Sequence, residues 1–213
     1  MLYAVFSKSS NDDEAGTLNQ IYKNWFATWM FTIAWQIFFM QETKIGMILA
    51  SCVIAFTASH MNAASVIARH NARNTWAQTV CVSLPSSIYA GWATLATTVQ
   101  FLVVGFAYDV SHDALVKASF ALLAVVLVIS MFQIFAAKDV FFVIPIVWGL
   151  LGVDGGATDD SIHVVAKTGA AVVAAAGLIE LCIQVFSHMQ TRPKNRENFV
   201  VVDKAGEPLL AKP

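Results

Sequence analysis

Charged residues are scarce in this sequence, and long stretches contain none. They make up 13% of the 213 residues, whereas hydrophobic residues make up 57%. Soluble domains carry about a quarter charged residues, so this composition excludes an ordinary soluble domain and indicates a membrane protein. The mean hydropathy of +0.63 agrees. A formal net charge of -1 argues against nucleic acid as a partner, because nucleic-acid binding calls for a basic surface.

Cysteine is sparse as well, and familiar catalytic motifs are missing. Cys52, Cys81 and Cys182 each lie in an apolar run, where a lone cysteine behaves as a small hydrophobe. No cysteines or histidines have the spacing of a zinc site. The sequence also has no glycine-rich phosphate loop, no Gly-x-Ser-x-Gly, no His-Glu-x-x-His and no carboxylate pair with acid–base spacing. We therefore predict neither a metal site nor an enzyme.

Apolar segments of membrane-crossing length follow one another along most of the chain. A helix of about 20 apolar residues crosses a bilayer. The run from Trp76 to Ala107 is too long for one straight crossing, and Pro85 removes a backbone donor within it. We expect a kink near Ser83, with the preceding residues in the membrane interface. The predicted fold is an all-α polytopic membrane bundle of about six helices, with spans 22–40, 44–66, 84–107, 115–136, 140–153 and 162–188.

Polar segments flank this bundle, and the connections between spans alternate in charge. Residues 1–21 form a polar segment, in which 7–20 are expected to be a loop or a surface segment, and residues 189–213 form a polar tail. Arg69, Arg73, Lys138 and the start of the tail are basic, whereas the connections after spans 84–107 and 140–153 are acidic. Because basic connections face the cytoplasm, we expect both termini on the cytoplasmic, stromal or matrix side, with the organelle open.

Small polar residues form a stripe along the span 84–107 and just before it. Their spacings of 4, 4, 3 and 4 place Ser83, Ser87, Gly91, Thr94 and Thr98 on one helical face. This stripe fits the wall of a ligand cavity, with hydroxyl groups from Ser87 and Thr94 orienting the ligand. Close helix packing at Gly91 explains the same spacing, because small residues let two backbones approach within a membrane. The spacing by itself favours packing.

Aromatic residues supply further ligand-contact candidates. Tyr89 and Trp92 lie on another part of the same span, and buried rings of this kind usually find a polar partner. In the first span, Trp25 is expected at the membrane interface. Trp35 and Gln36 lie deeper in that span and are better candidates for a cavity, although core packing explains them equally well.

The last span combines small residues with one carboxylate. Pairs such as Ala170 with Ala174, and Ala171 with Ala175, favour a tightly packed helix face that includes Gly177. Glu180 lies within the apolar run, where a carboxylate is costly and suggests a functional role. It could equally lie near the basic interface, within reach of Lys138 or Arg192, and the sequence leaves the two readings open.

A histidine in a membrane helix can ligate the metal of a haem or chlorophyll. The five histidines have no ligand spacing on a shared helix, and most of them lie near the predicted interfaces. His60 is the one candidate for a pigment or haem ligand, while a structural role remains the simpler interpretation.

Two segments carry a resemblance to a known family. Residues 84–97 read LPSSIYAGWATLAT and resemble the segment LPFSIYLGWITVAT of the larger tryptophan-rich sensory proteins, the TspO/MBR-like family. Residues 137–153, which contain Lys138, Asp139 and Trp148, look like the RRD…VWAxxGI helix of that family. The order and spacing agree from about residue 25 to residue 184. Ser86 replaces the family's usual phenylalanine, and the asparagine that follows VAT is missing.

The resemblance implies a TspO-like helix bundle that binds hydrophobic ligands such as tetrapyrroles or sterols. It also implies helices ahead of the matched part, and this chain apparently lacks them, because only residues 1–6 resemble the end of one. The implied cofactor is a tetrapyrrole (haem, porphyrin or chlorophyll), together with lipids. The ligand-contact prediction then comprises Trp35, Gln36, Ser87, Tyr89, Trp92, Thr94 and Trp148.

Two other functions stay open beside this one. The chain could be an accessory transmembrane subunit of a respiratory or photosynthetic complex, because small-residue faces on spans 84–107 and 162–188 suit packing against other membrane subunits. A transporter is the third hypothesis, favoured by the prolines that interrupt two spans, although no inverted repeat is visible. Membrane lipids are expected neighbours under all three hypotheses.

Overall fold

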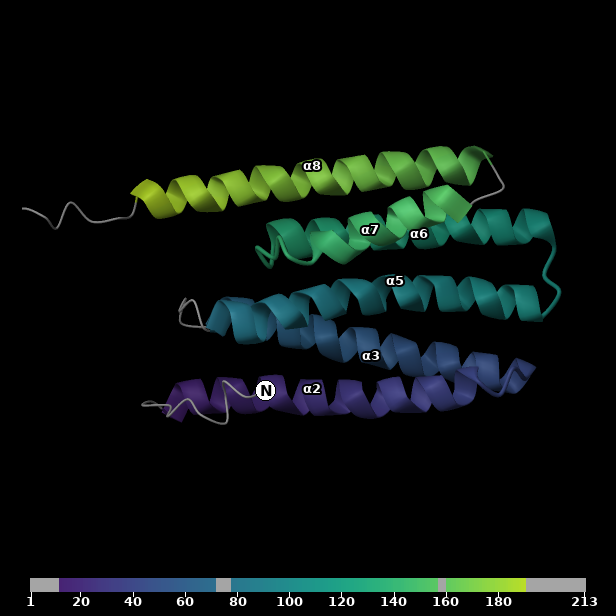
Figure 1. Cartoon of the computed structure of the whole chain (residues 1–213), viewed down its shortest axis with the longest axis horizontal. Helices are drawn as coiled ribbons and strands as arrows, with labels where there is room; N and C mark the ends of the chain where they lie inside the picture. Colours follow the sequence, from purple (N-terminus) through teal and green to yellow (C-terminus); the bar gives the residue numbers. More distant parts are fainter. Residues whose placement is uncertain (1–11, 72–77, 157–159, 191–213) are drawn as a thin grey trace, which may run out of the picture. The chain divides into compact units, whose positions relative to one another are not determined.

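The structure is a computed structural model that describes residues 12–71, 78–156 and 160–190, and all regular structure in these ranges is helical. The elements appear in Figure 1 in chain order, and each predicted span falls mostly within one helix. They are α2 (Asp12–Phe39), α3 (Lys44–Asn71), the π-helical turn η1 (Thr79–Ser83), α5 (Leu84–Ala107), α6 (His112–Phe135), α7 (Val143–Gly156) and α8 (Asp160–Gln190).

Helix α2 begins well before the first predicted span. It starts at Asp12, so the loop expected over residues 12–20 is wrong, and residues 1–11 lie outside the described residues. Burial explains the extension, because Leu18 and Ile21 are both buried and Ile21 packs against Ala68 of α3 and Val82 of η1. An apolar stripe facing a neighbouring helix stabilises a helical turn even where the other face is polar.

The connection into α5 contains a π-helical turn where a kink was expected. Leu84 donates its backbone N–H to the carbonyl of Thr79, five residues earlier, and Pro85 follows at the first turn of α5. A proline ring has no N–H and crowds the carbonyl four residues before it, and a wider turn relieves that crowding. The interfacial segment expected over residues 75–84 includes this turn; its first three residues lie outside the described residues, and its place at the membrane interface stays a prediction.

Four of the described helical stretches are long and apolar enough to span a membrane. They are Lys44–His70, Thr79–Ala107, His112–Phe135 and Asp160–Ser187. Helix α7 is apolar but has only 14 residues, and α2 begins with a polar stretch. A bilayer core about 30 Å thick is crossed by some 20 residues of helix, so α7 alone is too short to cross it.

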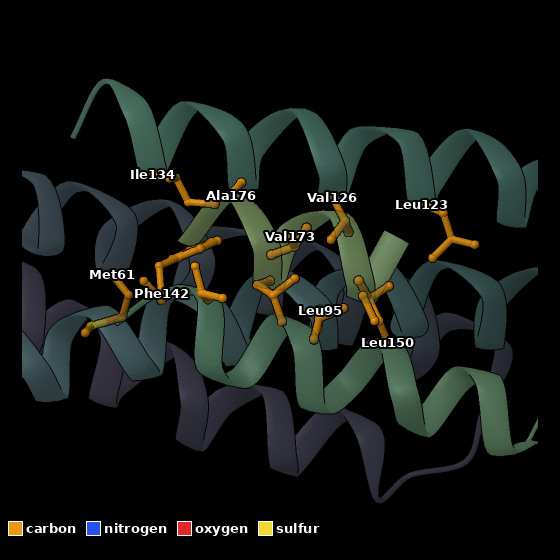
Figure 2. Packing of buried hydrophobic residues seen from close by; sticks show 13 residues of the cluster. Met61, Leu95, Leu123, Val126, Ile134, Phe142, Leu150, Val173 and Ala176 are labelled. Carbon is orange, nitrogen blue, oxygen red and sulfur yellow. The ribbon is translucent and has the colours of Figure 1, made fainter. Parts of the chain in front are cut away.

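The core lies among α3, α5, α6, α7 and α8. Figure 2 shows Met61 of α3, Leu95 of α5, Val126 of α6, Leu150 of α7 and Val173 of α8 converging in one cluster of buried residues. Small residues allow this close packing, since a Cβ on Gly169 would already lie 3.3 Å from Leu127 of α6. Helix α2 reaches the edge of the cluster through Trp25.

The last part of α8, from Leu181 onward, belongs to a second compact unit and is considered by itself. It remains helical to Gln190, and its large apolar side chains are exposed. These side chains are Leu181, Ile183, Val185, Phe186 and Met189.

In the described residues, three connections between helices contain a left-handed residue that is not glycine. Glu42, Asp109 and Lys138 have φ values of 51°, 56° and 59°. Each follows a long helix and redirects the chain into the next, a position where glycine would carry less strain. At Lys138 the side chain has a contact that glycine could not make, which is described below.

Candidate ligand-binding site

A row of aromatic rings runs between α2 and α5. The ring centroids of Trp25 and Tyr89 are 6.2 Å apart, those of Tyr89 and Trp92 are 5.4 Å apart, and those of Trp92 and Trp35 are 6.3 Å apart in an edge-on arrangement. Phe39 extends the row by stacking on Trp35 at 5.5 Å. These separations lie within the range of favourable aromatic pairs, so the two helices together present a continuous aromatic wall.

Three rings of this wall are hydrogen-bonded to neighbouring side chains. Trp25 donates its indole N–H to Ser86 Oγ at 2.9 Å. Trp35 donates its indole N–H to Gln100 Oε1 at 3.3 Å. Tyr89 shares a hydrogen bond of 2.8 Å with the hydroxyl of Thr32. These bonds fix the orientation of three rings and leave ring faces and edges, rather than polar atoms, for contact with a ligand.

Two adjacent grooves lie along the row of rings, and we call them together the aromatic groove. The larger has a volume of about 740 Å³ and is lined by Trp25, Trp29, Tyr89 and Trp92, with Trp148 of α7 on the opposite side. The smaller, of about 280 Å³, is lined by Trp35, Phe39 and Gln100 and shares Trp92, Pro145 and Trp148 with the larger. Trp148 is 72% exposed, so it forms the outer rim of the groove.

Four of the seven predicted ligand-contact residues meet in this groove, namely Trp35, Tyr89, Trp92 and Trp148. The other three lie elsewhere. Gln36 is exposed on α2 and lines neither groove, and Ser87 is buried with its hydroxyl donating to the carbonyl of Ser83. Thr94 faces α3 on the other side of α5, where it accepts a hydrogen bond from Asn62.

Gly91 explains how α7 comes close enough to form the groove. A Cβ added to Gly91 would lie 2.6 Å from Pro145 Cγ and 2.7 Å from the carbonyl oxygen of Phe142. A second contact of this kind occurs at Gly177 of α8, where a Cβ would lie 2.9 Å from Val143. Of the other two residues assigned to helix packing, Ala170 is buried in the core cluster and Ala174 is half-buried. Both glycine contacts fix the position of α7, and with it Trp148.

His60 lies between α2 and α3, away from the aromatic groove. Its Nδ1 is 2.9 Å from Asn24 Oδ1, and its ring stacks on Phe31 with centroids 5.6 Å apart. These contacts tie α3 to α2. Ligation of a tetrapyrrole metal by His60 stays a prediction. Among the residues that the structure describes, no three or more His, Cys, Asp or Glu side chains lie together as metal ligands would.

Asp139, in the middle of the connection from α6 to α7, joins several elements through hydrogen bonds that the sequence did not reveal. Its fully buried carboxylate accepts hydrogen bonds from Ser65 Oγ at 2.5 Å and Arg69 Nη2 at 3.3 Å, both of α3. It also accepts bonds from the backbone N–H groups of Phe141 and Phe142, just before α7 begins. A carboxylate is favourable at a helix N-terminus, so Asp139 caps α7 and ties it to α3.

Glu180 is paired next to these hydrogen bonds of Asp139. Its carboxylate is 1% exposed and lies 3.2 Å from Nζ of Lys138. Of the two readings that the sequence left open, the contact with Lys138 is therefore the one observed, while the basic residues of the tail lie outside the described residues. The pairing offsets the cost of a buried carboxylate and fastens α8 to the turn between α6 and α7.

A hydrogen-bonded pair of amides, one buried and one half-buried, was also missed in the sequence. Asn62 of α3 and Gln133 of α6 are joined by a hydrogen bond of 2.5 Å from Gln133 Nε2 to Asn62 Oδ1. A single amide side chain in an apolar span does predict an interhelical hydrogen bond, because the amide must find a partner within the bundle. Which partner it finds depends on the packing of helices far apart in the sequence.

The helices and grooves together define an integral membrane protein of the polytopic helix-bundle class, with apolar faces suited to lipid contact. A family model described as TSPO-like protein matches residues 1–181, and the chain therefore belongs to the TSPO-like protein family. No curated protein and no solved structure matches the chain.

Proposed function

We propose that this protein is a non-catalytic TspO-like membrane protein that binds a flat hydrophobic ligand, such as a tetrapyrrole or a sterol, in the aromatic groove. The observation that carries the proposal is the row of rings from Trp25 to Phe39, in which Trp25, Trp35 and Tyr89 are held by hydrogen bonds within the protein. Rings held in this way lose little freedom when a ligand stacks on them, which favours binding.

The size and chemistry of the groove support this class of ligand. Small-molecule pockets typically measure about 300–1,000 Å³ and are mostly apolar. The larger part of the groove, at about 740 Å³, falls within that range. Aromatic side chains attract flat ring systems through offset stacking and edge contacts. Trp92 and Trp148 line both parts of the groove, so a ligand longer than one part could extend into the other.

The same lining supports binding without catalysis. Among the described residues that line the groove, Tyr89 is the one with a titratable side chain. General acid–base catalysis needs a positioned proton donor or acceptor, and apart from Tyr89 and Gln100 the described lining is aromatic or aliphatic. A sensing, storage or carrier role follows more directly from this composition than a reaction does.

Titration of the purified protein with protoporphyrin IX tests the proposal. We expect saturable quenching of tryptophan fluorescence in detergent or nanodiscs. Replacing Trp148 by leucine removes an exposed ring from the rim, and we expect it to weaken binding about five- to tenfold, the worth of one aromatic pair. Phe106→Leu is the matched control, because Phe106 is an exposed ring of α5 that lies outside the groove. Quenching that does not saturate, or equal loss in both variants, would contradict the proposal.

We further propose that both termini lie on the cytoplasmic, stromal or matrix side. Arg69, Lys138 and Asp139 meet at one end of the bundle, where their contacts join α3 to the α6–α7 turn. The turns at Lys44 and Asp109 meet at the other end, with Lys44 Nζ 3.3 Å from the Asp109 carboxylate. The test uses a variant without native cysteines and an impermeant maleimide added on the side of the membrane opposite the proposed side of the termini. Ser111→Cys should react with it, and Ala136→Cys should not. The reverse pattern would invert the topology.

A second candidate, an accessory subunit of a larger membrane complex, is favoured by one specific observation. Ala171 and Ala175 are four residues apart on α8, and both are exposed, while Ala170 and Gly177 face the core. Small residues at this spacing promote helix association in membranes. Under this candidate, Ala175→Leu should reduce co-purification of partner subunits from native membranes, whereas Val172→Leu, at a neighbouring exposed position, should not. A free monomer in mild detergent would count against it.

A further inference from the structure

The face of α5 that lies opposite the aromatic groove borders a second, separate groove. This groove has a volume of about 850 Å³ and lies between α3, α5 and α6, and we call it the amide groove. Its walls are mostly apolar, and exposed Val125, Val128 and Phe132 of α6 form its mouth. Because these side chains belong to a membrane-spanning helix, the mouth opens toward the lipid.

A chain of hydrogen bonds crosses the floor of the amide groove. Asn62 Nδ2 donates to the carbonyl of Ala58 at 2.8 Å and to Thr94 Oγ1 at 3.1 Å. Gln133 Nε2 donates to Asn62 Oδ1. The hydroxyl of Thr94 in turn donates a hydrogen bond to the carbonyl of Ala90 at 2.8 Å.

This chain determines which way both amides point. The Ala58 carbonyl can only accept, so Asn62 must turn its NH₂ group toward it and its oxygen toward Gln133. Gln133 must then present its own NH₂ group to that oxygen. The oxygen of Gln133 is left over, and Gln133 Oε1 is buried without a hydrogen-bond partner in a side chain that is 2% exposed. A buried acceptor without a donor is unfavourable, particularly in apolar surroundings.

The other polar groups of the lining cannot supply the missing donor. The hydroxyl of Ser59 donates to the carbonyl of Ala55, that of Thr98 donates to the carbonyl of Thr94, and that of Thr97 donates to backbone carbonyls as well. Both amide protons of Asn62 are also engaged. These hydroxyl and amide hydrogens are therefore already used in hydrogen bonds, while oxygen lone pairs in the groove remain available. A ligand that carries a hydrogen-bond donor is favoured there.

We propose that the amide groove binds an apolar, membrane-soluble alcohol, whose hydroxyl group donates a hydrogen bond to Gln133 Oε1. The apolar body of this ligand lies against the aliphatic walls of α3 and α6, and a small rotation of the Gln133 side chain brings its oxygen to the hydroxyl. This site is separate from the aromatic groove and binds independently of a flat ligand there, because the two grooves share α5 but no lining residue.

Photocrosslinking in nanodiscs tests this site with a matched pair of probes. One probe is a diazirine-bearing hexadecanol and the other is its methyl ether, which has the same apolar body without the donor. On the wild-type protein we expect saturable labelling of the lining residues of α3 and α6, with the alcohol preferred roughly tenfold at equal mole fraction, as one hydrogen bond implies. Equal labelling by the two probes, or no saturable labelling, would overturn the proposal, and neither result depends on a variant.

Two variants then assign the preference to Gln133. Gln133→Met keeps the length of the side chain but removes the acceptor, so we expect the alcohol to lose its advantage over the ether. Gln100→Leu is the control, since Gln100 is an equally buried glutamine that serves Trp35 in the aromatic groove. We expect it to keep the preference. If Gln133→Met also kept it in folded protein, the site would be overturned, whatever the outcome of the porphyrin titration.

Discussion

The two sides of α5 differ in how they use polar side chains. Toward α2 and α7, Ser86 and Gln100 accept hydrogen bonds from indole rings and hold them in place. Toward α3 and α6, Thr94 takes part in a chain of amides that ends in an acceptor without a donor. Similar residues therefore orient rings on one side and leave a hydrogen bond open on the other. In a membrane, the role of a polar residue depends on whether its neighbours satisfy all of its hydrogen-bond donors and acceptors.

The largest expected effect comes from Asp139→Ala, which should disturb both sides of α5 at once. Asp139 caps α7, which borders the aromatic groove, and binds Ser65 and Arg69 of α3, which borders the amide groove. Removing one partner of a buried ion pair costs about 3–5 kcal/mol. We expect a loss of that order in the free energy of unfolding, measured by denaturant titration in detergent.

Asp113→Ala provides the control for this variant. Asp113 pairs with Lys117 on the exposed first turn of α6, and exposed pairs of this kind contribute less than about 1 kcal/mol. A similar loss in both variants would show that the hydrogen bonds of Asp139 do not join the two sides.

Gly91→Ala should affect the aromatic groove and leave the amide groove unchanged. The added Cβ meets backbone at Phe142 and the ring of Pro145, so α7 must move away from α5. Overpacking of this kind costs about 1–3 kcal/mol. We expect weaker porphyrin quenching, because Trp148 moves with α7, and an unchanged preference for the alcohol probe in the amide groove. Gly152→Ala, in the same helix as Trp148 but with open space around it, should instead gain stability by a few tenths of a kcal/mol.

Tyr89→Phe should have the smallest effect, and it tests only how far ring orientation contributes to binding in the aromatic groove. The variant loses the bond to Thr32, whose hydroxyl also has the carbonyl of Thr28 as a partner. We expect a loss of about 0.5–1.5 kcal/mol in stability and a porphyrin affinity reduced about threefold, because the central ring is held less firmly. Thr98→Val, on the amide side, should leave porphyrin binding as it is. An unaltered affinity in Tyr89→Phe would mean that ring orientation contributes little.

The helices could largely be predicted from the sequence, because apolar runs of membrane length and their breaks at turns are local properties. Residues 84–107, predicted as one span, form α5 with the same bounds. The start of α2 could not be predicted in this way, since residues 12–20 are polar on average. Their helix depends on burial of Leu18 and Ile21 against segments that are distant in the sequence.

The site could be predicted only in part, for a geometric reason. The spacing of Ser83, Ser87, Gly91, Thr94 and Thr98 does place them along one stripe, but the stripe is broad. An α-helix turns 100° per residue, so Gly91 and Thr94, three residues apart, point in directions about 60° apart. Gly91 consequently meets α7, whereas Thr94 meets α3. The pairing of Asn62 with Gln133 also follows from how the helices are arranged, and no local pattern encodes it.

The π-helical turn at Thr79–Ser83 makes this stretch tolerant of a change in chain length. A π-turn accommodates one residue more than an α-helix does, so we expect deletion of one residue between Thr79 and Ser83 to restore regular helix and leave α5 intact. Because the π-turn already absorbs the extra residue, the helical residues on either side of the deletion would keep their orientation, and Val82 would keep its contact with Ile21 and Ala68. A single codon lost here would thus shorten the segment that enters α5 without altering either groove.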